Sequence, residues 1–158
     1  MRVSARTPES ELDSFLAKYT PEIQSRATAI LVRMRELVPS AIELVYDNYN
    51  ALAIGFSPTE RASEAIFSIA VYPKWVSLFF LQAKGLKDPD GLLQGSGSVA
   101  KHVVLPDVGA LDDPKVRKLM EAAKRLAKVP LRADTVHRVV VKSVSAKQRP
   151  RRPAAKSA

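Results

Sequence analysis

The sequence predicts an α+β fold in which an antiparallel β-sheet is packed by an N-terminal helix pair and a C-terminal helix. Residues 7–37 place apolar side chains at helical spacing, residues 41–105 contain short apolar segments separated by turn signals, and residues 113–128 return to the helical period. The expected order of elements is α-α-β-β-β-β-β-α-β. Helices and strands are therefore segregated along the chain, as in α+β domains.

Each predicted helix has a start signal. Thr7-Pro8, Thr20-Pro21 and Asp113-Pro114 each place a capping oxygen before a proline at the first helical position. Pro39 and Pro130 end the second and third helices, because proline cannot continue a helix. The three apolar faces carry Leu12, Phe15, Leu16 and Tyr19, then Ile23, Ala27, Ile30, Leu31, Met34 and Leu37, then Val116, Leu119, Met120, Ala123, Leu126 and Ala127.

The middle of the chain predicts the sheet. Segments 42–46 and 51–56 flank a turn-like cluster, and segments 65–72 and 75–81 flank a Pro73-Lys74 hairpin turn. Segments 65–72 and 75–81 are apolar on both faces, so we expect them to be central strands. Their predicted core side chains are Phe67, Ile69, Val71, Leu78 and Phe80.

The rest of the sheet comes from two later segments. Residues 99–105 are a fifth strand candidate, and the β-branched residues 135–144 predict a final strand at an edge. The long loop between residues 82 and 98 holds the turn Asp88-Pro89-Asp90-Gly91. Its Gly95–Ala100 stretch matches a relaxed dinucleotide fingerprint, but no strand precedes it and no helix follows, so we interpret it as a loop.

Length and charge divide the chain unevenly. The 158 residues suit a single domain, residues 1–144, followed by a basic tail, residues 145–158, that we expect to be disordered because alanine is its only apolar residue besides proline. Residues 1–70 hold 7 Lys or Arg against 9 Asp or Glu, whereas residues 71–158 hold 18 against 7. The net charge of +9 therefore comes from the second half of the chain.

Composition excludes several function classes. The chain has no cysteine, so disulfides, cysteine-based zinc sites, iron–sulfur clusters and thiol nucleophiles are excluded. The apolar run Leu78–Leu81 is too short to span a membrane and the N-terminus lacks a secretory signal, so we expect a cytoplasmic protein. His102 and His137 lie on expected strands without a motif that pairs them with a nucleophile. The sequence thus favours a protein that is not an enzyme and needs no cofactor.

The stretch from Tyr46 to Asn50 has the composition of a ligand site. Tyr46, Asp47, Asn48 and Tyr49 bring two phenols, a carboxylate and an amide together, and Trp75, the single tryptophan, opens a neighbouring strand. Tyrosine and tryptophan offer apolar area with a polar group, which suits contact with a small polar ligand. The leading hypothesis is therefore a binding domain for a small polar ligand or metal.

Two further hypotheses stay open. The basic helix face and tail predict contacts with nucleic acid or an acidic partner, because exposed cations neutralise phosphates without regard to sequence. The residues concerned are Lys115, Lys118, Arg125, Lys147, Arg149, Arg151 and Arg152. The acidic residues of the helix pair offer hard oxygen ligands to a metal, although a solvated helix face with favourable dipole placement explains them better. They are Glu9, Glu11, Asp13 and Glu22.

Four segments carry a family resemblance: VYDNYNALAIGF (45–56), YPKWVSLFFLQAKGLKDPDGLLQGSG (72–97), KHVVL (101–105) and VVVKSVSAKQRPRRP (139–153). With them the chain resembles the bacterial YdhG-like family over about residues 40–153. That family is a domain of unknown function, and the resemblance implies helices packed on an antiparallel sheet. Distant members resemble frataxin-like proteins, implicated in iron handling. Iron binding of that kind would imply exposed acidic ridges, whereas this chain is basic overall.

Overall fold

The structure, a computed structural model, describes residues 7–153. It has the α+β order that the sequence predicts, with two N-terminal helices, a six-stranded sheet and a later helix before the final strand. The elements are α1 (Pro8–Leu16), α2 (Pro21–Leu37), β1 (Ile42–Asp47), β2 (Leu52–Ser57), β3 (Phe67–Val71), β4 (Val76–Phe80), β5 (Lys101–Val104), α3 (Pro114–Leu126) and β6 (Val139–Val144). Two short 3-10 helices, η1 (Ala62–Glu64) and η2 (Val108–Asp112), lie in the connections.

The strands are ordered β5-β4-β3-β2-β1-β6. Neighbours from β1 to β5 are antiparallel, and β3 and β4 each have a strand on both sides, as expected of central strands. β6 lies at the edge, as predicted, but it pairs parallel with β1, so the expectation of a purely antiparallel sheet is wrong there. The reason is the long connection through η2 and α3, which carries the chain from one edge of the sheet to the other.

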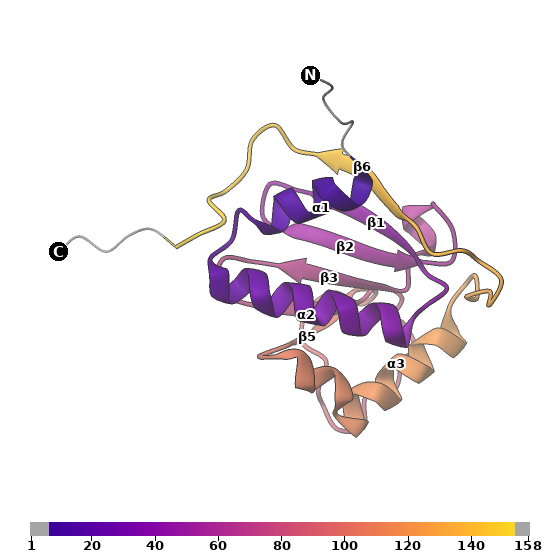
Figure 1. The fold of residues 1–158 in the computed structure, drawn as a ribbon. Coiled ribbons are helices and arrows are strands. Elements are labelled where there is room, and N and C mark those ends of the chain that lie inside the picture. Colours follow the sequence, from indigo (N-terminus) through magenta and orange to yellow (C-terminus); the bar gives the residue numbers. More distant parts are fainter. Residues whose placement is uncertain (1–6, 154–158) are drawn as a thin grey trace, which may run out of the picture.

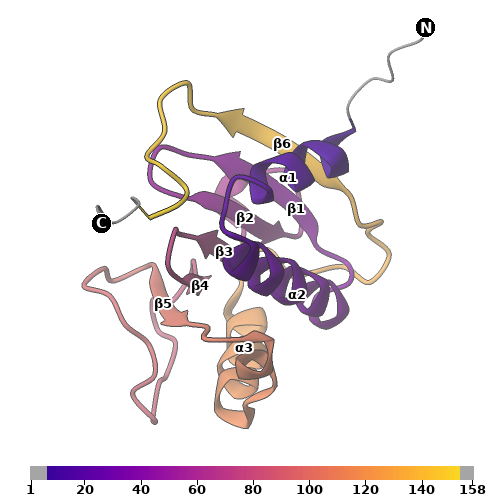
Figure 2. The same ribbon diagram turned by 60° about the vertical axis from the view of Figure 1, so that its left-hand side comes forward.

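One face of the sheet is covered by helices (Figures 1 and 2). Side chains of α1, α2 and α3 belong to one buried cluster with alternate residues of the strands. Within it, the rings of Phe67 and Phe80 meet edge to face at 5.6 Å between their centres. The five core residues predicted on the central strands, Phe67, Ile69, Val71, Leu78 and Phe80, are all fully buried.

The helix starts are capped as predicted. Thr7 Oγ1 accepts a hydrogen bond from the Ser10 amide at 3.1 Å, and Thr20 Oγ1 accepts one from the Ile23 amide at 3.3 Å. Asp113 Oδ1 accepts one from the Lys115 amide at 2.9 Å. These bonds satisfy amides that have no partner inside the helix, so the caps fix where each helix begins.

Tyr19 fastens the junction between α1 and α2 to the sheet. Its side chain is fully buried, and its hydroxyl donates to the Val71 carbonyl at 2.7 Å and accepts from the Leu52 amide at 3.2 Å. Burial raises the pKa of Tyr19 to about 12. The phenol is therefore neutral at physiological pH and acts as a hydrogen-bonded core residue.

The C-terminal segment, residues 145–153, differs from the disordered tail that the sequence suggests. It returns past the turn between β1 and β2 (Figure 2), where the Ser145 amide donates to the Asp47 carbonyl and the Arg149 amide to the Tyr49 carbonyl, both at 2.8 Å. Arg151 is only 5% exposed. An ion pair thus replaces the apolar anchor that this segment lacks. Residues 154–158 of the expected tail lie outside the described residues.

Candidate functional site

The face of the sheet opposite the helices carries a groove, and the strand register explains its shape. Ala53 pairs with Ala70, and Gly55 pairs with Ser68, so four small residues lie together in the middle of this face. Larger side chains flank them in the same rows, because Tyr46 pairs with Ala53 on one side and Phe79 with Ser68 on the other. Small residues on β2 and β3, with larger ones on β1 and β4, produce a trough.

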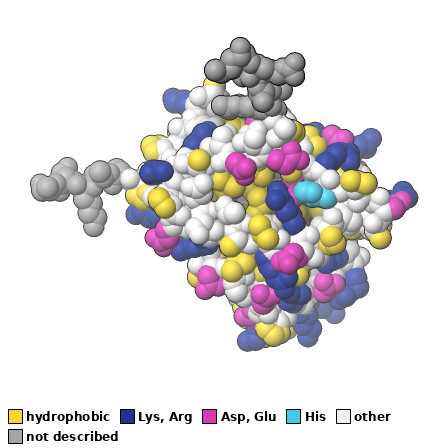
Figure 3. Space-filling view, in the orientation of Figure 1, with side chains coloured by type: hydrophobic (Ala, Val, Ile, Leu, Met, Phe, Trp, Pro, Cys, Tyr) yellow, Lys and Arg dark blue, Asp and Glu magenta, His cyan; other side chains and the backbone are white. Residues whose placement is uncertain are grey.

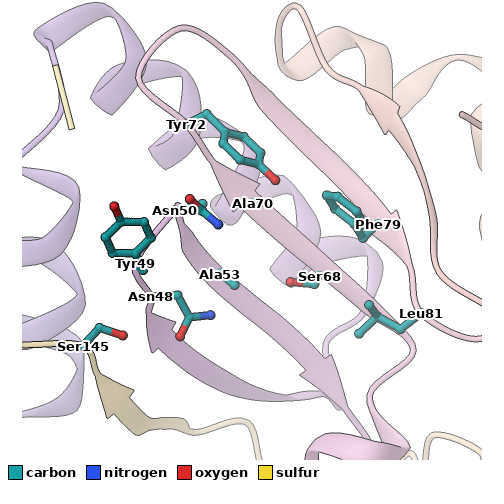
Figure 4. A pocket seen from close by; sticks show the side chains of 11 residues that line it. Asn48, Tyr49, Asn50, Ala53, Ser68, Ala70, Tyr72, Phe79, Leu81 and Ser145 are labelled. Carbon is teal, nitrogen blue, oxygen red and sulfur yellow. The ribbon is translucent and has the colours of Figure 1, made fainter. Parts of the chain in front are cut away.

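We call this trough the sheet groove. It encloses about 520 Å³. Its floor is formed by β2 and β3, and its walls by the β1–β2 turn on one side and by β4 on the other (Figure 4). The lining comprises Asn48, Tyr49, Asn50, Ala51, Ala53, Ser68, Ala70, Tyr72, Phe79, Leu81 and Ser145. Amide, hydroxyl and aromatic groups therefore face one apolar floor.

Tyr46 lies in a smaller cavity beside the sheet groove. This cavity of about 180 Å³ shares Ser68 and Leu81 with the groove. The Tyr46 hydroxyl is buried and has no hydrogen-bond partner among the described residues, and burial raises its pKa. A buried hydroxyl without a partner costs free energy. The Tyr46 hydroxyl, like that of Ser77 beside Ala70, is therefore a polar group of this face that a ligand or a water would stabilise.

The predicted ligand stretch is divided between the two faces of the sheet. Asn48 and Tyr49 line the sheet groove, as does Asn50, whereas Asp47 points to the helix side because strand residues alternate. Asp47 is fully buried and pairs with Lys18 Nζ at 2.7 Å and Arg151 Nη2 at 2.9 Å. Asp47, predicted as a ligand contact, therefore lies on the opposite face from the sheet groove, and its carboxylate pairs with two cations of the fold.

The electrostatics of Asp47 agree with this role. Burial alone would raise the pKa of its carboxyl, but the hydrogen bonds from Lys18 and Arg151 outweigh that effect and hold the pKa below its usual value. Asp47 is thus ionised at neutral pH and keeps both cations in place. Through Arg151 it also fixes the C-terminal segment next to the sheet groove.

Trp75 lies in a second groove that adjoins the first. This groove of about 750 Å³ shares Asn50 and Tyr72 with the sheet groove. Trp75 is 42% exposed and stacks on Tyr72, with 4.6 Å between ring centres and 19° between ring planes. Its other lining residues are Pro73, Lys74, Arg149, Pro150, Arg152 and Pro153. We call it the basic groove. Because it adjoins the sheet groove, Trp75 lies near Asn48 and Tyr49, although it lines a different groove.

The cations predicted to contact nucleic acid are dispersed. Arg149 and Arg152 line the basic groove, Lys147 is exposed elsewhere on the C-terminal segment, and Arg151 is buried, so Arg151 cannot contact a nucleic acid. The helix residues Lys115, Lys118 and Arg125 line a separate groove of about 300 Å³ that also contains Asp88 and Asp90. Figure 3 shows this basic side of the molecule around α3, which contributes nothing to the basic groove.

The sequence does not identify several of the residues that line the two grooves as site residues. The sequence identifies only strand or turn positions for Tyr72, Phe79 and Lys74, yet each of these residues lines one of the two grooves. One signal was available, since Ala53, Gly55, Ser68 and Ala70 interrupt otherwise bulky strands at alternate positions. Such alternation marks one face with little side-chain volume.

A second buried carboxylate lies on the helix side of β1. Glu43 is fully buried and receives hydrogen bonds from Arg35 at 2.7 and 2.9 Å, while His137 Nε2 lies 2.5 Å from its Oε2. His137 precedes β6, so this contact ties the start of the edge strand to α2. The histidine–carboxylate pair therefore holds the fold and lies on the face opposite the sheet groove.

Neither a cluster of metal-ligating side chains nor a membrane-crossing helix is present among the described residues. Within residues 7–153, no three His, Asp or Glu side chains converge so that they could hold a metal ion, and Glu9, Glu11, Asp13 and Glu22 form no such group. Among the same residues, no helix combines the length and apolarity that crossing a membrane requires.

Comparison with models of known families, with curated proteins and with solved structures finds no match to this chain.

Proposed function

We propose that this protein binds a small polar ligand in the sheet groove. The observation that supports this most is the register that collects Ala53, Gly55, Ser68 and Ala70 between larger side chains. A sheet face built for packing against another layer would fill these positions with large apolar residues. Here Ala53, Ser68 and Ala70 line a hollow of about 520 Å³, within the range of small-molecule sites, and Gly55 lines the smaller cavity beside it.

The polar groups of the groove suit binding rather than proton transfer. Asn48 and Asn50 offer amides, Ser68 and Tyr72 offer hydroxyls, and Tyr46 holds a buried hydroxyl beside them. Amides and hydroxyls orient a ligand through hydrogen bonds and keep their protonation state near neutral pH. We therefore propose a binding domain without catalytic activity, and we propose that it is related to the YdhG-like family that its sequence resembles.

Contact with nucleic acid or an acidic partner through α3 is the weaker proposal. Its helix residues share their groove with Asp88 and Asp90, whose charges oppose a polyanion. Arg151 is occupied by Asp47 in the interior. The seven cations predicted for this role thus form no continuous stripe among the described residues.

Thermal unfolding with a panel of small polar compounds tests the proposal. The panel contains amino acids, sugars, nucleosides and nucleotides. A ligand present at a hundred times its Kd raises the free energy of unfolding by about 2.7 kcal/mol. For a chain of this size that raises the Tm by roughly 5–10 °C. Ala53→Leu fills the groove floor and should abolish the rise, whereas Ala133→Leu, at an exposed loop position, should preserve it. A rise that persists in Ala53→Leu contradicts the proposed site.

A further inference from the structure

We infer that the ligand is a phosphomonoester that carries an aromatic ring, with the ring in the sheet groove and the phosphate in the basic groove. This inference rests on the proposed function and adds the chemical class of the ligand. The two grooves share Asn50 and Tyr72, so one molecule can occupy both. The sheet groove supplies aromatic and amide groups, and the basic groove supplies cations.

The charge of the basic groove is of one sign. Lys74, Arg149 and Arg152 line it, and none of its described lining residues is acidic. These three cations form no ion pair within the described part of the chain. The groove beside α3 and the groove beside Arg138 both include carboxylates. A site with several unneutralised cations attracts an anion.

The two arginines are held in place by the fold. The Arg149 amide is bonded to the Tyr49 carbonyl at 2.8 Å, and its guanidinium lies 5.7 Å from the centre of the Tyr49 ring. Arg152 Nε donates to the Lys18 carbonyl at 3.1 Å, which leaves its two terminal nitrogens without a partner among the described residues. Arg151, between them, is buried against Asp47. Preorganised guanidinium groups lose less entropy when they bind an anion.

A phosphate fits this arrangement better than a carboxylate. A phosphomonoester carries about −1.5 to −2 charge at pH 7 and presents three acceptor oxygens. Two guanidinium groups and an ammonium carry three positive charges, which a phosphate neutralises to a greater extent than a carboxylate does, and they can supply a donor to each of its three oxygens. A carboxylate carries one charge and two acceptor oxygens, so it would leave part of the cluster unused.

The aromatic character of the ligand follows from the neighbouring walls. Tyr49, Tyr72 and Phe79 line the sheet groove, and its floor of small residues admits a flat group between them. Planar aromatic and heterocyclic groups stack favourably on aromatic side chains. Asn48 and Asn50 offer donors and acceptors at the ring edge.

Trp75 fluorescence provides a direct assay, because it is the only tryptophan of the chain and lies in the basic groove. We expect saturable quenching by adenosine 5′-monophosphate, weaker binding of adenosine and of inorganic phosphate, and affinity that falls with salt. Affinity should also rise from pH 5 to pH 7, as the phosphate gains its second charge. The Arg149→Gln/Arg152→Gln variant should weaken the nucleotide about 10- to 100-fold and leave adenosine unchanged.

Controls separate charge from folding. Lys115→Gln/Lys118→Gln removes the same charge from α3 and should leave nucleotide binding unchanged. Arg149→Lys/Arg152→Lys should recover most of the affinity lost in the glutamine variant. If the glutamine variant unfolds, Lys74→Gln, on the exposed β3–β4 turn, provides the same comparison.

The outcomes distinguish this inference from the proposed function. Equal binding of adenosine and its monophosphate, or binding that the glutamine variant does not weaken, overturns the phosphate assignment and leaves the sheet groove as a ligand site. The same conclusion follows if a neutral compound binds to the wild type but not to Ala53→Leu, while the nucleotide does not bind at all. Tighter binding of a short single-stranded oligonucleotide than of the mononucleotide assigns the basic groove to nucleic acid instead. Absence of binding by every panel compound contradicts both.

Discussion

Replacing Arg151 by methionine should destabilise the protein by about 2–3 kcal/mol. The side chain is buried at the end of the C-terminal segment, where Nη2 donates to Asp47 Oδ1 at 2.9 Å and to the Asn48 carbonyl, and Nη1 donates to the Tyr49 carbonyl at 3.3 Å. Methionine keeps much of the side-chain length but can make none of these bonds. The segment 145–153 would lose its interior anchor.

The magnitude follows from what remains at Asp47. Removing one partner of a buried ion pair costs about 3–5 kcal/mol when the other charge is left alone. Lys18 still neutralises Asp47 at 2.7 Å, which reduces the loss. The Arg151 Nε is buried without a partner among the described residues. Removing it relieves that penalty and offsets about 1 kcal/mol of the lost unfolding free energy. The remaining 2–3 kcal/mol corresponds to a fall in Tm of roughly 4–12 °C.

Urea unfolding of this variant and of two truncations measures the effect. A chain ending at residue 153 should match the full chain within about 0.5 kcal/mol. A chain ending at residue 148 should be destabilised at least as much as Arg151→Met, because it also removes the bond between the Arg149 amide and the Tyr49 carbonyl. An unchanged midpoint for both Arg151→Met and the shorter chain would refute the reasoning and restore the disordered tail.

The same ion pair predicts a pH dependence. The folded-state pKa of Asp47 lies below its usual value. A carboxyl of this kind stabilises the fold above its unfolded-state pKa, about 3.9, and this contribution is lost as the pH falls through the folded-state pKa. The difference between the wild type and Arg151→Met should therefore be full at pH 7 and shrink in acid below pH 4.

Three further substitutions test the core, a cap and the site. Phe67→Ala removes a fully buried ring and should cost about 3–5 kcal/mol in urea unfolding, and an unchanged midpoint would contradict its central position. Thr20→Ala should cost about 1 kcal/mol, because the Ile23 amide loses its acceptor, and Thr20→Ser should retain the stability. Tyr46→Phe removes a hydroxyl without a described partner and should leave stability equal or higher by up to about 1 kcal/mol; a clear loss would reveal a bound water or partner.

Local signals made the framework predictable. Thr20-Pro21 and Asp113-Pro114 determine helix starts through atoms within a few residues, so the sequence contains nearly all the information required. The core strand around Phe67 was predictable for a similar reason, because an apolar run on both faces allows few positions other than the centre of a sheet.

Long-range pairings made the rest unpredictable. Arg151 and Asp47 are 104 residues apart, and composition alone places a basic, apolar-poor segment in the disordered class. The direction of β6 depends on the path through η2 and α3, which no local pattern encodes. The sheet groove depends on which residues share a row, and a shift of one residue in register would have placed Ala53 and Ala70 against the helices.

The C-terminal segment connects the stability of the fold with the chemistry of the site. Arg149 and Arg152 line the basic groove while Arg151 faces the interior, so three neighbouring cations divide into two at the groove and one that anchors the segment. The anchor needs the buried carboxylate of Asp47, which lies directly before the groove residues Asn48, Tyr49 and Asn50. The end of β1 is therefore connected to the site in two ways. The backbone continues from Asp47 into the groove wall, and the ion pair between Asp47 and Arg151 anchors the segment that carries Arg149 and Arg152. Asp47, which the sequence suggests as a ligand contact, positions the site from the opposite face of the sheet.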